Sequence, residues 1–199
     1  MAAYHGVVIV RLTSGASGTA AGLICVAIAT TMLAGCGRDV PASAEVGTTV
    51  IAPNDREPLP ALTGSTLDGA SLDLASLRGK VVVLNSWASW CEPCKAEIPA
   101  FVALSSSADP TRVAVVGLDV SDEKSAAAAF ADEYAMTYPS IVDQSGDLLA
   151  SVPGVPPKAI PSTVVLDAKG RIAARIIGGA DPSELTGIVA SVDAESGPS

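Results

Sequence analysis

Hydrophobic residues in this chain fall into runs whose spacing predicts strands and helices in alternation. Two runs are almost continuously apolar and rich in β-branched residues, as in strands buried on both faces: KVVVLNSW over 80–87 and VAVVGLDV over 113–120. A shorter strand is expected over 140–142. The runs STVVLD over 162–167 and RIAARII over 171–177 are joined by a connection that suits only an antiparallel hairpin.

Segments with helical spacing lie between and after these strands. The longer ones are expected over 93–105, 122–136 and 181–192, and a short one over 146–152. Ser121 or Asp122 is the expected cap of the second helix. Asp181 is the expected cap of the last helix, with Pro182 at its first position. Pro99 is expected to kink the first helix.

The order of these elements predicts an α/β fold with a mixed central sheet covered by helices on both faces. Strand–helix–strand units give parallel pairs with right-handed crossovers, whereas the terminal hairpin adds antiparallel strands. Ahead of the first long strand, residues 59–74 carry turn signals at Gly64 and at Asp68-Gly69. They predict an additional N-terminal hairpin.

The N-terminal region has the composition of an export signal. Residues 1–35 hold no Asp or Glu, and the apolar stretch over 19–33 is shorter than the roughly 20 residues of a membrane span. The following Leu33-Ala34-Gly35-Cys36 resembles the bacterial lipobox, in which the signal is cut before a cysteine that carries a lipid. We expect lipidation at Cys36; a plain cleaved signal and an uncleaved anchor are the alternatives.

This processing sets the expected domain boundaries and the cysteine count. We expect a signal peptide over 1–35, a flexible tether over 36–57, a folded domain over 58–193 and a disordered tail over 194–199. Cys25 and the only histidine, His5, would leave with the signal. The mature domain would then keep two thiols and no histidine.

The charge pattern of this chain does not resemble that of a nucleic-acid-binding protein. The formal net charge is −9, and the 12 Lys and Arg residues are scattered rather than gathered into a basic patch. A negative charge keeps the domain off anionic lipid, so membrane attachment would depend on the lipid at Cys36.

The stretch SWCEPCK over 89–95 holds the candidate chemistry. It follows a buried strand and opens a helix, which places Cys91 where unpaired backbone N–H groups and the helix dipole favour a thiolate. Pro93 suits the first helical turn, because its missing N–H would have been unpaired there. An ionised Glu92 would oppose the thiolate.

Three kinds of site use cysteines at this spacing. A structural zinc site needs four N or S ligands, and the mature chain supplies only two, so no metal is expected. A structural disulfide stabilises best when it closes a long loop, which Cys91 and Cys94 would not. The strand-to-helix setting favours a redox dithiol.

The segment around the cysteines resembles the active site of thioredoxin-fold proteins, and more narrowly of their TlpA/ResA-like extracytoplasmic branch. That branch shows the pattern N-x-W-A-x-W-C-x-P-C-x-x-E-x-P. The matching residues are Asn85, Trp87, Ala88, Trp90, Cys91, Pro93, Cys94, Glu97 and Pro99. Ser86 departs from the family, which usually has Phe there, and looser packing is expected beneath the motif.

The resemblance implies roles for these residues within a thioredoxin-like domain. Cys91 would attack a substrate disulfide and Cys94 would resolve the mixed disulfide, leaving a Cys91–Cys94 disulfide. Thioredoxins proper have a proton-relaying Asp where this chain has Asn85. Glu97, three residues after Cys94, is the replacement candidate.

The resemblance also implies a second wall of the site. Pro161 matches the position of a cis-proline that faces the dithiol, where backbone groups of Ile160 would pair with an extended substrate. Trp90, Glu92 and Pro93 are the other expected substrate-binding residues. Residues 122–152 would form the central insertion of the family, which helps to shape substrate choice.

By this resemblance the protein is expected to be a thiol–disulfide oxidoreductase, lipid-anchored on the outer side of a bacterial cytoplasmic membrane. It would reduce disulfides in extracytoplasmic proteins such as apocytochrome c. The expected partners are a disulfide-bearing protein substrate and an upstream membrane thiol reductant. No cofactor, metal or nucleic acid is expected, and the protein is expected to be a monomer.

Three alternatives remain open at this point. The first is an oxidase that forms disulfides in secreted proteins. The second is a thioredoxin-fold peroxidase, although the Thr found three residues before the peroxidatic cysteine is replaced by Ala88. The third is a non-enzymatic surface lipoprotein whose disulfide is only structural.

Overall fold

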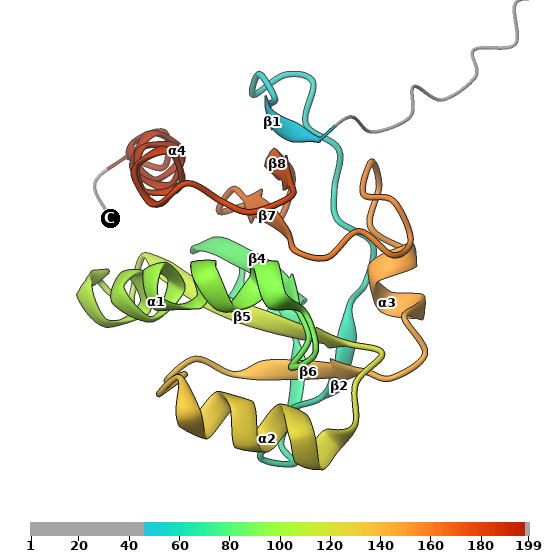
Figure 1. The fold of residues 1–199 in the computed structure, drawn as a ribbon. Helices are drawn as coiled ribbons and strands as arrows, with labels where there is room; N and C mark the ends of the chain where they lie inside the picture. The colour runs from blue at the N-terminus through green and yellow to red at the C-terminus, as the bar shows by residue number, and fades with distance from the viewer. Residues whose placement is uncertain (1–45, 198–199) are drawn as a thin grey trace, which may run out of the picture. The chain divides into compact units, whose positions relative to one another are not determined.

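A mixed six-stranded sheet forms the centre of the molecule (Figure 1). The computed structural model describes residues 46–197. Strands β4, β5 and β6 are parallel, and β7, β8 and β1 join them in antiparallel pairs, so the predicted mixed sheet is confirmed. Across the sheet the order is β1 (Gly47–Val50), β8 (Ile172–Ile177), β7 (Ser162–Leu166), β4 (Val81–Trp87), β5 (Val113–Val120) and β6 (Ser140–Asp143).

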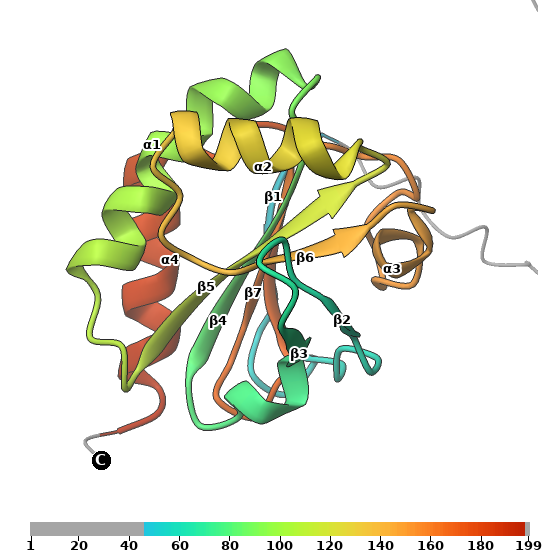
Figure 2. The same cartoon turned by 90° about the horizontal axis from the view of Figure 1, so that it is seen from below.

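Different elements cover the two faces of the sheet (Figure 2). The three longer helices lie on one face: α1 (Glu92–Ser107), α2 (Lys124–Glu133) and α4 (Pro182–Ala194). The other face carries the hairpin of β2 (Thr63–Ser65) and β3 (Ser71–Asp73), the 3-10 helix η1 (Leu74–Leu77) and the short α3 (Asp147–Ala150). The predicted N-terminal hairpin is therefore present.

The side chains of β4 show why this run is apolar throughout. Val81 and Val83 pack in one core with residues of α1 and α4, whereas Val82 and Leu84 pack in the other core with the hairpin and α3. Every residue of β4 is buried. Since strand side chains alternate between faces, a strand covered on both sides must be apolar at successive positions. This central strand leads directly to the cysteines.

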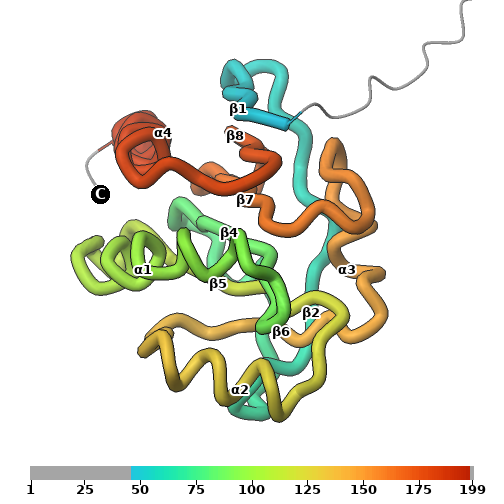
Figure 3. Tube along the Cα trace, viewed as in Figure 1, coloured from blue at the N-terminus to red at the C-terminus, as the bar shows by residue number. Residues whose placement is uncertain are grey.

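The structure corrects the predicted tether where it describes it. Residues 47–50 form β1, which pairs with β8 although the two are far apart in the sequence (Figure 3). Arg56 is buried and its guanidinium lies 2.6 Å from a Glu195 carboxylate oxygen. The prediction of a flexible tether is thus wrong over 47–57. Cys36 and the predicted signal peptide over 1–35 lie outside the described residues.

The predicted disordered tail is also wrong at its beginning. Helix α4 runs to Ala194, and Asp193 pairs with Arg112 at 2.9 Å. Glu195, directly after α4, accepts hydrogen bonds from both terminal guanidinium nitrogens of Arg56. These ion pairs bind the C-terminal end of the last helix to the body of the domain.

Helix α2 is shorter at its start than predicted. Its N-cap residue is Glu123, not Ser121 or Asp122. The Asp122 carboxylate turns instead toward Ser89, just ahead of the cysteines. By contrast, Asp181 caps α4 as predicted and accepts the N–H groups of Ser183 and Glu184.

Within residues 46–197, the longest helices fall short of the length and apolar character that a membrane span requires.

Candidate active site

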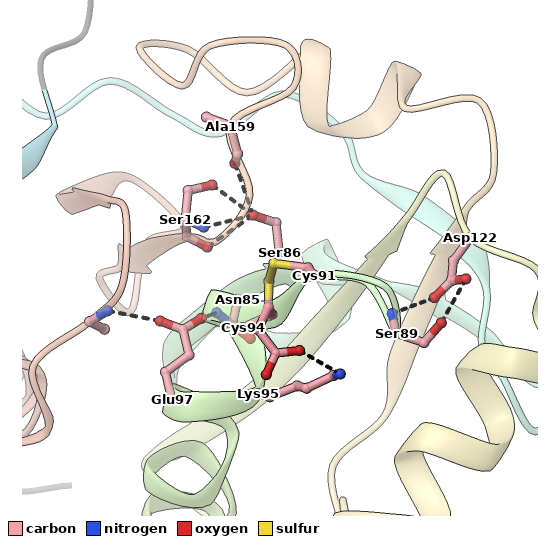
Figure 4. The surroundings of a disulfide bond; sticks show 12 residues. Asn85, Ser86, Ser89, Cys91, Cys94, Lys95, Glu97, Asp122, Ala159 and Ser162 are labelled. Carbon is pink, nitrogen blue, oxygen red and sulfur yellow. Dashed lines mark hydrogen bonds and ion pairs between the residues drawn. A yellow bond between two sulfur atoms is a disulfide. The ribbon is translucent and has the colours of Figure 1, made fainter.

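The cysteine pair lies at the junction of β4 and α1, as predicted. Cys91 is the N-cap residue of α1 and Cys94 lies in its first turn. A disulfide joins them, with a Cα–Cα distance of 5.3 Å (Figure 4). Cys94 is fully buried and Cys91 is 4% exposed, so a partner that reaches this pair must approach from the Cys91 side.

The start of α1 determines the electrostatics around Cys91. No side chain caps the N-terminus of α1. Its first N–H groups, which point toward the N-terminal end of the helix, are therefore available near Cys91. These groups and the helix dipole favour negative charge there, and therefore a thiolate at Cys91. Glu92 brings an opposing charge, but Lys95 pairs with its carboxylate at 2.7 Å on the surface (Figure 4).

Hydrogen bonds connect the loop before Cys91 to the loop that follows β5. The N–H of Ser89 donates to Asp122 at 2.5 Å, and its hydroxyl donates to the same carboxylate at 2.9 Å (Figure 4). The Trp90 indole N–H donates to the Ser121 carbonyl at 3.2 Å. The Trp90 ring is nevertheless 60% exposed. It offers an apolar surface beside the disulfide, consistent with its predicted contact with substrate.

Glu97 is buried in α1, one turn after Cys94. Its two carboxylate oxygens accept the Asn85 amide at 2.7 Å and the Ala180 N–H at 2.8 Å. Burial raises the pKa of Glu97, and these two hydrogen bonds offset part of that effect. Asn85 thus donates a hydrogen bond to a buried carboxyl group whose pKa is raised.

The predicted second wall of the site has the expected backbone. The peptide bond between Ile160 and Pro161 is cis, directly before β7. Ile160 packs against the core group that contains Cys91 and Cys94. Its N–H donates to the Lys158 carbonyl at 3.1 Å, whereas its own carbonyl accepts no hydrogen bond from residues 46–197. Of the two backbone groups, only the carbonyl is free to pair with a substrate.

Ser86, beneath the motif, is buried and hydrogen-bonded. It is 2% exposed, and its hydroxyl contacts Ala159 and Ser162, which flank the cis-proline (Figure 4). The departure from the family pattern was visible in the sequence. Its partners were not, because they lie more than 70 residues away.

Two further residues were missed as members of the site. Asp122 was interpreted as a helix cap, and Asp119 was interpreted only as part of a buried strand. Asp119 is fully buried, and burial together with the nearby Asp122 and Asp143 carboxylates raises its pKa to about 7. A carboxylate at the end of an apolar strand is a signal that sequence reasoning could have used.

The predicted central insertion supports the site from the side. Residues 122–152 contain α2, β6 and α3. Phe130 of α2 stacks on Trp87 with ring centroids 5.0 Å apart, and Ala127 joins the core group around the cysteines. The insertion thus buries the strand end that carries the dithiol.

Fold and site together define a class of protein. A dithiol at a strand-to-helix junction, with a cis-proline before the next antiparallel strand, is the arrangement of a thioredoxin-fold thiol–disulfide oxidoreductase. The chain belongs to the AhpC/TSA family, whose model matches residues 56–175. The similarities to individual proteins lie within the same class.

Curated relatives include thiol–disulfide oxidoreductase ResA of Bacillus anthracis, which is 29% identical over 126 residues, covering 63% of this chain and 71% of the relative. The thioredoxin-like protein YneN of Bacillus subtilis is 40% identical over 110 residues, covering 54% of this chain and 62% of the relative. These matches support the TlpA/ResA-like assignment.

Solved structures of similar fold include a DsbF homologue from Corynebacterium diphtheriae, with a TM-score of 0.69 and 32% identity over 73% of this chain and 92% of that one. A secreted Mycobacterium tuberculosis disulfide oxidoreductase, described as homologous to Escherichia coli DsbE, has a TM-score of 0.57 and 29% identity. It aligns with 65% of this chain and 95% of its own. The predicted thioredoxin-like fold is thereby confirmed.

Proposed function

We propose that this protein reduces disulfides in extracytoplasmic proteins, with apocytochrome c as a substrate, while attached to the membrane through a lipid on Cys36. The observation that carries the proposal is the buried Cys91–Cys94 pair at the start of α1. The structural neighbours that are described as secreted support an extracytoplasmic location.

The charges near the pair support the reducing direction. A thiolate that is strongly stabilised makes a dithiol a strong oxidant, because the reduced form is then favoured. Here the first turn of α1 carries the carboxylate of Glu92, and the neighbouring cation, Lys95, is paired with it. A carboxylate beside the thiols disfavours the thiolate, which lowers the potential toward the reducing end.

The proposed cycle transfers two electrons from the protein dithiol to the substrate. The Cys91 thiolate attacks one sulfur of the substrate disulfide and displaces the other as a thiolate. The Cys94 thiolate then attacks the Cys91 sulfur, which releases the second substrate thiol and leaves the Cys91–Cys94 disulfide. An upstream membrane thiol reductant restores the dithiol.

Glu97 is the proposed proton partner of Cys94. A carboxyl group with a raised pKa can hold a proton in the oxidised protein and exchange it with a buried thiol during resolution. No hydrogen bond between Glu97 and a sulfur atom is present among residues 46–197, where its oxygens bind Asn85 and Ala180. Exchange therefore requires rearrangement of the carboxyl group in the reduced protein or the mixed disulfide.

The proposed substrate contacts surround Cys91. The exposed Trp90 ring supplies apolar contact, and the polypeptide of the substrate pairs with the free Ile160 carbonyl by strand addition. Glu92 and Pro93 form the rim on the helix side. We expect the protein to act as a monomer.

An oxidase of secreted proteins is the second candidate, because thiol–disulfide exchange at the same site can run in reverse. A peroxidase is less well supported, since the buried Ala88 offers no hydroxyl to a peroxide at the position of the expected Thr. Rapid consumption of hydrogen peroxide by the reduced protein would establish the peroxidase instead.

The reduction potential of the pair, measured against glutathione standards, tests the direction. Potentials of this fold span about −270 to −120 mV, and we expect a value in the lower half. A value near −120 mV would establish the oxidase. Trapping with Cys94→Ala in intact cells would then isolate substrates as mixed disulfides at Cys91, with Cys91→Ser/Cys94→Ala as the control that captures none.

A further inference from the structure

Ser86 joins the two halves of the site. It belongs to β4, five positions before Cys91, and its backbone is in register with Ser162 of β7. The side chain is buried between β4 and the loop that holds the cis-proline, Pro161 (Figure 4). One hydroxyl thus connects the strand that presents the dithiol with the opposite wall.

The hydrogen bonds of this hydroxyl surround the cis-proline. The Ser162 N–H donates to the Ser86 oxygen at 3.1 Å. The Ser86 hydroxyl is within donor distance of the Ser162 carbonyl at 3.0 Å and of the Ala159 carbonyl at 3.5 Å. The two serine hydroxyl oxygens lie 2.7 Å apart. The contacts reach Ala159 on one side of Ile160-Pro161 and Ser162 on the other.

These contacts use the full capacity of a hydroxyl group. A serine side chain has one donor and two acceptor positions. If the Ser86 proton goes to the nearer carbonyl, that of Ser162, the two lone pairs can accept the Ser162 N–H and the Ser162 hydroxyl. A hydrocarbon side chain at this position could make none of these bonds.

We propose that Ser86 is a positioning residue that fixes the Ile160-Pro161 backbone opposite the dithiol, so that the free Ile160 carbonyl can pair with the chain of a polypeptide substrate. The inference rests on the proposed function. It assigns Ser86 to substrate alignment and leaves the exchange chemistry to Cys91 and Cys94. Small disulfides have no extended backbone, so they do not use this alignment.

Ser86→Ala tests the proposal with two oxidised substrates, a disulfide-bonded peptide of about ten residues and glutathione disulfide. A buried hydrogen bond contributes about 1 kcal/mol, which corresponds to roughly a fivefold change, and loss of several bonds gives more. We expect kcat/KM for the peptide to fall about tenfold, mainly through KM. The rate with glutathione disulfide and the oxidised fraction at a fixed glutathione ratio should stay within twofold.

Two variants serve as controls. Ser86→Thr keeps the hydroxyl and suits a strand, so it should restore peptide turnover to within about threefold. Ser140→Ala removes another buried serine hydroxyl, one that has no hydrogen-bond partner among the described residues. It should leave both substrates unaffected. If Ser86→Ala fails to fold, Ser162→Ala, which removes only the hydroxyl contact, should still lower peptide turnover about twofold and spare glutathione disulfide.

The proposal is overturned if Ser86→Ala slows both substrates equally, or leaves the peptide unaffected. Equal slowing would place Ser86 in the exchange chemistry or in general stability. A Cys91→Ser protein measured in parallel separates this result from failure of the proposed function. Persistence of turnover in Cys91→Ser would contradict the function itself, whereas loss of turnover there leaves the function intact and isolates the result for Ser86.

Discussion

Single side chains around the dithiol have distinct tasks that can be separated by substitution. Glu97 is held by Asn85 and by the Ala180 N–H, and burial raises its pKa. Glu92 lies on the surface in an ion pair with Lys95. The buried carboxyl group suits proton transfer, whereas the exposed one acts through its charge on the stability of the Cys91 thiolate.

Glu97→Gln should slow resolution of the mixed disulfide by at least about tenfold, because the proton partner of Cys94 is lost. The fold should be retained. The side-chain oxygen of Asn85 has no hydrogen-bond partner among the described residues, and rotation of the Asn85 amide would let this oxygen accept a hydrogen bond from the new amide at position 97. Stopped-flow measurement of substrate release as a function of pH checks this. The exposed Glu133→Gln is the control. Equal rates at every pH would remove Glu97 from the mechanism.

Glu92→Gln should raise the reduction potential by about 5–20 mV, since loss of an exposed charge changes thiolate stability by about 0.2–1 kcal/mol. Lys95→Met should shift the potential in the opposite direction, because it leaves the Glu92 charge unpaired. Equilibration with glutathione buffers measures both variants. Shifts of the same sign would contradict the electrostatic account.

At the scale of elements, the ends of β4 and β5 place polar groups beside the cysteines. Asp119 is the last but one residue of β5, and Asp122 follows in the loop that binds Ser89. Burial and two neighbouring carboxylates raise the pKa of Asp119 to about 7. The folded protein therefore keeps a proton on Asp119 that the unfolded chain releases near its ordinary value of 3.8.

Linkage fixes the sign of the resulting pH dependence. The stabilising effect of neutral Asp119 is complete below about pH 4, and it is lost as the pH rises toward about 7. The side chain of the Asp119→Asn variant stays neutral at every pH. Between pH 5 and 7 the free energy of unfolding should therefore decline less in the variant than in the wild type, and the difference in slope should be up to about 1.4 kcal/mol per pH unit. Urea unfolding of both proteins at several pH values measures this. Parallel declines would show that Asp119 is not protonated in the folded protein.

The elements that sequence reasoning found are those whose pattern is local. The buried strands over 80–87 and 113–120 were predicted because both faces of each strand are covered, which leaves a continuous apolar run. β1 was missed because GTTV over 47–50 is short and half polar, and its pairing depends on the distant edge of β8. The start of α2 was misplaced because Asp122 suits a cap and was instead used by Ser89.

The residues of the candidate site likewise fall into those with a local sequence signal and those without one. Cys91, Cys94, Glu97 and Pro161 were predicted, because a contiguous motif and a resemblance identify them. The role of Ser86 depends on contacts with residues that approach only after the sheet has formed. Such long-range pairs have no signature in one sequence.

At the scale of the whole molecule, an ion-pair group binds the two ends of the described chain. Arg56 has a side chain only 2% exposed and contacts Asp167 at 3.4 Å and Glu195 at 2.6 Å. Asp167 also pairs with Arg171 at 2.7 Å. The group lies by β1 and the end of α4, and it shares no residue with the disulfide site.

Arg56→Met should therefore lower stability and spare activity. Loss of one partner from a buried ion pair is destabilising, and retention of Arg171 beside Asp167 limits the loss to about 1–3 kcal/mol. Chemical denaturation checks the stability, and the exchange rate should stay within twofold. Arg78→Met, at an exposed arginine, is the control. A loss below about 0.5 kcal/mol would mean that the ion pairs do not stabilise the fold.

The proposed mechanism depends on Cys91 as the attacking group and Cys94 as the resolving group. Its most direct test is reduction of a protein disulfide by the Cys91→Ser protein, compared with wild type and with Cys94→Ser. We predict at least about a thousandfold loss of turnover in Cys91→Ser with no mixed disulfide, and accumulation of a mixed disulfide at Cys91 in Cys94→Ser. Undiminished turnover by Cys91→Ser would contradict the account.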